Sequence, residues 1–69
     1  MNRDALIRDL RAYGRAHGLE VRWEPRQGKG SHGRLTVGAR FTMVPAGQIK
    51  RFMLETILRQ LGLPKDLIR

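Results

Sequence analysis

The apolar residues of this chain change their spacing twice, and that change limits the folds open to it. Near both ends of the sequence they recur at helical spacing, which is typical of a helix with one buried face. Between residues 19 and 44 they alternate with polar residues, which is typical of half-buried strands. The sequence has no cysteine, so neither a disulfide nor thiolate-bound zinc can replace apolar packing in a chain of 69 residues. We therefore predict one small α+β domain, residues 1–69.

Two helices are predicted, over residues 3–17 and from Arg51 to Gly62. Asn2 suits the N-cap of the first helix and Gly18 its end. Gly14 costs the helix roughly 1 kcal/mol relative to alanine, so we expect it to serve a close approach to the sheet. The first apolar stripe consists of Leu6, Ile7, Leu10 and Tyr13, and the second of Met53, Leu54, Ile57, Leu58 and Leu61.

Three strands are predicted, over residues 19–24, 31–37 and 41–44. If all the large apolar side chains of the last two strands face the core, Val37 must lie opposite Phe41. A three-residue loop would then join them, because a two-residue loop would mix apolar and polar side chains on one face. The same parity predicts a polar face that carries His32, Arg34, Thr36 and Thr42.

The predicted order is helix, three strands and helix, with both helices on one face of a three-stranded antiparallel sheet. This α-β-β-β-α order is the topology of double-stranded-RNA-binding domains. Topology alone does not assign a function, so the functional argument has to come from particular residues.

The stretch from Gly28 to His32 gathers the residues that could carry chemistry. Gly28 and Gly30 permit a turn whose N–H groups bind an anion, and Lys29 adds positive charge. His32 can give or take a proton near neutral pH. A phosphate held beside an imidazole is the minimum needed to cleave RNA. The alternative is an ordinary hairpin turn with one surface histidine, because short glycine motifs match by accident.

The net charge of +8 is carried by eleven arginines and three lysines against six acidic residues. Such an excess favours polyanions, and arginine binds phosphate in a bidentate way. Nucleic acid is the first candidate partner, an acidic protein the second and an anionic membrane surface the third. The alternative is that the charge only keeps the protein in solution.

The sequence does not favour a membrane span, a secreted location or a metal site. No run of about 18 apolar residues is present, so no membrane span is expected. No apolar signal segment follows Met1, so we expect a cytoplasmic protein. Two histidines and six acidic residues show no metal-binding spacing, so we expect no metal and no cofactor.

Several segments together resemble the HicA family of bacterial toxins. These segments are Gly30-Ser31-His32, Val44-Pro45, Ile49-Lys50 and Leu54-x-x-Ile57-Leu58-Arg59-Gln60-x-Gly62-Leu63. The family consists of small ribonucleases that cut mRNA and are held inactive by the HicB antitoxin. The resemblance covers residues 28–63, and residues 3–24 match only by element order and apolar pattern.

The resemblance implies that His32 is the catalytic histidine and that Gly30 and Ser31 are the pair before it. Two positions depart from the family pattern. Gly33 stands where many members carry a second histidine or a bulky residue, and Phe52-Met53 replaces a Gly-Thr pair.

Three functions fit these observations. The first is a metal-independent RNA endonuclease, a toxin with a HicB-type antitoxin as partner, in which His32 is the general base and a cyclic phosphate results. The second is a non-catalytic RNA-binding module, and the third is an adaptor for an acidic protein. The endonuclease has no evident second acid. Its expected RNA- and phosphate-binding residues are Gly28, Lys29, Gly30, Ser31, Arg34 and Lys50.

Overall fold

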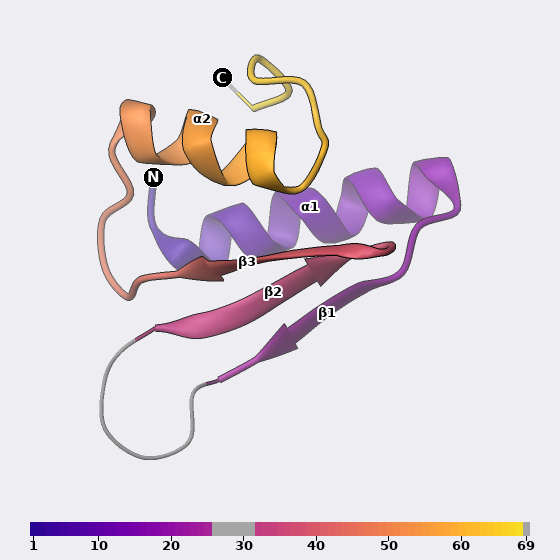
Figure 1. The fold of residues 1–69 in the computed structure, drawn as a ribbon, viewed down its shortest axis with the longest axis horizontal. Helices are drawn as coiled ribbons and strands as arrows, with labels where there is room; N and C mark the ends of the chain where they lie inside the picture. Colours follow the sequence, from indigo (N-terminus) through magenta and orange to yellow (C-terminus); the bar gives the residue numbers. More distant parts are fainter. Residues whose placement is uncertain (26–31, 69) are drawn as a thin grey trace.

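The computed structural model describes residues 1–25 and 32–68. It contains two helices and one antiparallel sheet with the strand order β1-β2-β3 (Figure 1). This arrangement confirms the predicted α+β fold and its α-β-β-β-α order. The elements are α1 (Arg3–His17), β1 (Val21–Glu24), β2 (Gly33–Val37), β3 (Arg40–Val44) and α2 (Arg51–Gln60).

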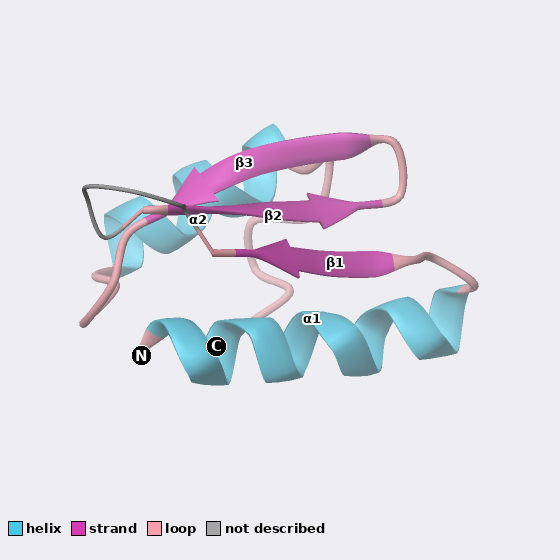
Figure 2. Ribbon diagram, turned by 90° about the horizontal axis from the view of Figure 1, so that it is seen from below, coloured by secondary structure: helices cyan, strands magenta, loops and turns pink. Residues whose placement is uncertain are grey.

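Both helices lie on one face of the sheet. α1 packs against β1 and β2, and α2 packs against β3 (Figure 2). The side chains buried between the two layers form a single cluster to which both helices and the two longer strands contribute. No described element covers the other face, which we call the outer face. The cluster consists of Leu6, Ile7, Leu10, Leu35, Val37, Val44, Ile49, Leu54, Ile57, Leu58, Leu61 and Ile68.

The helix ends follow the capping residues that the sequence predicts. The Asn2 side chain accepts a hydrogen bond of 2.8 Å from the Ala5 N–H at the start of α1. Gly18 ends α1 in the left-handed region with a φ of 69°. α2 begins at Arg51, and Gly62 follows its end with a φ of 73°. Both glycines adopt a conformation that other residues rarely accept.

Gly14 permits the close approach between α1 and the first strand. A Cβ atom at Gly14 would lie 2.6 Å from the Leu19 carbonyl oxygen and 2.7 Å from Cγ2 of Val21. Both distances are shorter than any ordinary carbon contact. The structure therefore confirms the reason predicted for a glycine inside this helix.

The register of the second hairpin differs from the prediction. Val37 pairs with Arg40 and Thr36 pairs with Phe41, so the loop contains two residues instead of three. Gly38, the first loop residue, has a φ of 62°, which suits a tight two-residue turn. The predicted pairing of Val37 with Phe41 is therefore wrong by one residue.

The one-residue change reverses the faces of β3. Phe41 and Met43 lie on the outer face with 55% and 40% of their surface exposed, whereas Thr42 is only 4% exposed on the inner face. Thr42 can be buried because its hydroxyl donates a hydrogen bond to Oε1 of Gln60 on α2. The prediction failed because it required every large apolar side chain to face the core, and it placed Thr42 on the polar face.

We expect Gly14→Ala to lower the free energy of unfolding by about 1 kcal/mol or more, because the added methyl group is overpacked against the strand. Urea denaturation would measure this. The exposed Ala12 on the same helix offers the control, since Ala12→Gly should cost about 1 kcal/mol through helix propensity alone. A stabilising Gly14→Ala would show that propensity outweighs the contact.

Candidate nucleic-acid interface

The candidate site lies at the end of the sheet where β1 leads into β2. Four of the predicted phosphate-binding residues, Gly28, Lys29, Gly30 and Ser31, lie outside the described residues, and their roles stay predictions. His32 is described and exposed, and it immediately precedes β2. β2 begins at Gly33, and the predicted start at residue 31 lies outside the described residues.

His32 and Arg34 fall on the same side of the sheet. Gly33, between them, is buried opposite Val44 on the inner face. Alternation between faces places Arg34 on the outer face, and we infer the same face for His32 by continuing the alternation one residue beyond the start of β2. Both His32 and Arg34 are exposed, in agreement with the polar face predicted for them.

Gly33 leaves room for Trp23. A Cβ atom at Gly33 would lie 2.2 Å from Cη2 of the Trp23 ring, which packs against the core cluster. The Arg3 guanidinium lies over the same ring, 4.8 Å from the ring centroid. The glycine that departs from the family pattern is therefore explained by packing, and it holds the backbone next to His32 against the indole.

A surface hollow lies beside Arg34 on the outer face. Its lining includes Glu24, Pro25, Arg34 and Met43. Three of these residues form one row across the sheet, because Glu24 pairs with Arg34 and Arg34 pairs with Met43. The pair Gly33–Val44 separates this row from His32, which lies two residues before Arg34 in the chain.

Glu24 supplies a carboxylate that the sequence analysis did not assign. If the register with β2 is continued to His32, the two residues are diagonal neighbours, a spacing of roughly 7–8 Å between backbone positions in an antiparallel pair. The alternation of residues 19–24 already predicts that Glu24 and Trp23 lie on opposite faces of the sheet. Only the register with β2 reveals that it lies beside Arg34 and His32.

Lys50 belongs to the helix layer. It is the exposed N-cap of α2 and makes no side-chain capping bond. α2 begins at the same end of the molecule as β2, but on the other layer (Figure 1). The structure therefore brings Arg34 to the face of His32 and leaves Lys50 on the helix side.

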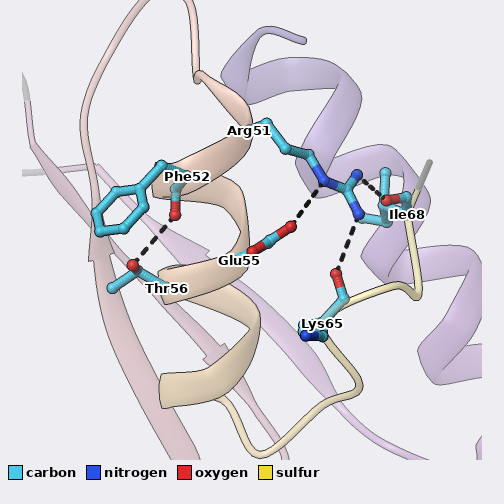
Figure 3. Close-up of polar contacts among 6 residues, drawn as sticks. All are labelled: Arg51, Phe52, Glu55, Thr56, Lys65 and Ile68. Atoms are coloured by element: carbon cyan, nitrogen blue, oxygen red, sulfur yellow. Dashed lines mark hydrogen bonds and ion pairs between the residues drawn. The ribbon is translucent and has the colours of Figure 1, made fainter.

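The neighbouring cation, Arg51, has a structural role. Its guanidinium donates hydrogen bonds to the carbonyl oxygens of Ile68 and Lys65, at 2.5 and 3.3 Å (Figure 3). The same side chain pairs with Glu55 at 3.1 Å. Arg51 thereby ties the C-terminal turn to the first turn of α2.

The second histidine lies elsewhere. His17 is exposed in the last turn of α1, and its ring stacks on Tyr13 with 4.0 Å between the ring centroids. The last turn of a helix favours a positively charged side chain, so this position has a structural explanation.

Residues 1–25 and 32–68 contain no group of three side chains that could hold a metal ion. Within the same residues, no helix has the length and apolar character needed to cross a membrane. A comparison with known proteins finds no matching family model, curated protein or solved structure.

We expect Arg51→Ala to lower the free energy of unfolding by about 1 kcal/mol, because two carbonyl bonds are lost at a partly exposed site. Amide hydrogen exchange should accelerate at residues 65–68. Lys50→Ala is the control and should change stability by less than about 0.5 kcal/mol. Equal effects of the two substitutions would contradict the structural role of Arg51.

Proposed function

We propose that this protein is an mRNA-cleaving endoribonuclease of the HicA toxin type, with His32 as its catalytic residue. The observation that carries the proposal is an exposed histidine, His32, two residues before Arg34, which lines a surface hollow on the uncovered face of the sheet. The net charge of +8 supports RNA as the ligand. An acidic HicB-type antitoxin is the proposed partner, and it would cover the outer face.

Cleavage requires two proton transfers. The 2′-hydroxyl loses its proton and its oxygen attacks the adjacent phosphorus, while the bond from phosphorus to the 5′ oxygen breaks. The 5′ oxygen takes up a proton, and the products are a 2′,3′-cyclic phosphate and a 5′-hydroxyl end. Arg34 would stabilise the charge that develops on the phosphate oxygens, together with the predicted contribution of Lys29.

Glu24 is a candidate for the second proton-transfer group that cleavage needs besides His32. His32 alone would have to accept the first proton and deliver the second. With a carboxylate beside it, Glu24 can accept the proton of the 2′-hydroxyl, which leaves a protonated His32 to donate to the 5′ oxygen. The division of roles uses two side chains that lie on one face and needs no metal.

The runner-up is a non-catalytic RNA-binding module of double-stranded-RNA-binding-domain type. In that function the arginines carry the affinity and His32 is incidental. The positive charge supports both functions equally, so a comparison of cleavage with binding is needed to separate them.

We expect His32→Ala to cleave an mRNA fragment roughly 10²- to 10⁴-fold more slowly than the wild type, because an acid–base group is removed. It should fold and bind RNA normally, and its induced expression should not arrest growth. His17→Ala, the matched control, should retain cleavage and toxicity. If His32→Ala cleaves as fast as the wild type, the RNA-binding module is the better description.

We expect Glu24→Gln to lower kcat by roughly 10²-fold, since it removes a proton acceptor without changing the shape of the side chain. Its KM should stay the same or fall, because a negative charge leaves the phosphate-binding face. Glu20→Gln, four residues earlier, is the matched control and should leave kcat unchanged. An unaltered kcat in Glu24→Gln would make Glu24 an ordinary surface carboxylate.

A further inference from the structure

The outer face carries an aromatic ring that contributes nothing to the core. Phe41 is the second residue of β3 with 55% of its surface exposed, and Met43 on the same face is 40% exposed. The row that contains Phe41 continues through Thr36 to Arg22 on β1. An aromatic and a thioether exposed together between polar neighbours indicate a contact surface.

A cation accompanies the ring. The Arg34 guanidinium lies 4.7 Å from the centroid of the Phe41 ring. Arg34 is the diagonal neighbour of Phe41, and Arg22 lies in the same row as the ring. A ring with a guanidinium group beside it offers a stacking surface for a base and positive charge for the phosphates that follow it.

The ring also lies in line with the candidate catalytic group. From His32 the chain passes Arg34 to Thr36, which pairs with Phe41. Four residues of extended chain span roughly 13 Å. The hollow lined in part by Arg34 and Met43 adjoins this path. A nucleotide chain whose phosphate meets His32 can therefore place a nearby base over Phe41.

We propose that Phe41, with Arg34, is a base-stacking platform that selects single-stranded RNA as the substrate of this site. The inference rests on the proposed function. A base in a duplex already stacks on both of its faces, so only an unpaired base can lie on the ring. Every base can stack on an aromatic ring. We therefore expect a preference for unpaired segments and no fixed recognition sequence. The positive charge of the chain favours RNA over a second copy of the protein at this face.

The test measures the binding of a labelled oligoadenylate by fluorescence anisotropy in a His32→Ala background, where cleavage does not interfere. Phe41→Leu keeps an apolar side chain but removes the aromatic face. We expect it to weaken binding by about 5- to 150-fold, which corresponds to the loss of about 1–3 kcal/mol for one stacked base. Phe41→Trp should bind at least as tightly as its parent. Phe52→Leu is the matched control, because Phe52 on α2 is 80% exposed and lies in the helix layer, so its substitution should leave binding unchanged.

A second measurement identifies the stacked base. Abasic nucleotides are introduced one at a time into the oligoadenylate. At one position, the abasic nucleotide should weaken binding to the parent protein but should not weaken binding to Phe41→Leu any further. The affinity for an RNA duplex of the same sequence should not change when Phe41 is replaced. Unchanged oligoadenylate affinity in Phe41→Leu would overturn the proposal. It would also be overturned if Phe41→Leu weakened binding to an acidic protein partner and not to RNA. Because these measurements use the His32→Ala protein, a failure of stacking is distinct from a failure of the catalytic role, which wild-type cleavage tests.

Discussion

The structure depends on the burial of one face of a three-stranded sheet beneath two helices. A sheet of this width presents an inner surface that two helices can cover, and the cluster of twelve buried apolar residues forms there. The closeness of α1 to the sheet depends on Gly14, since a methyl group at that position would meet the Leu19 carbonyl oxygen at 2.6 Å. Because both helices are used on the inner face, the outer face remains open, and the residues that could bind a ligand lie on it.

The two-residue hairpin turn determines what the outer face contains. It pairs Thr36 with Phe41, so the aromatic ring points away from the core and Thr42 points into it. The hydrogen bond from Thr42 to Gln60 satisfies the buried hydroxyl and links β3 to α2. One turn therefore joins two properties of the molecule. It completes the core with a small polar side chain, and it provides an exposed aromatic ring beside Arg34.

Trp23 and Gly33 connect the core with the candidate site. The indole fills the space that a side chain at residue 33, next to His32, would need. The pairing of β1 with β2 sets Glu24 opposite Arg34. The backbone beside the imidazole is thus held by packing, while its side chain stays in solvent.

The sequence by itself determined the order of the elements, both helix ends and the reason for Gly14. These features follow from local rules, namely helical spacing, capping side chains and the left-handed conformation of glycine. It also predicted the placement of His32 and Arg34 on one face, because alternation is a property of a single strand. The register of β3, the exposure of Phe41 and the position of Glu24 beside His32 were decided by tertiary structure. They depend on how two strands pair and on which β3 side chain packs against α2. A rule that buries every large apolar residue cannot predict either of these.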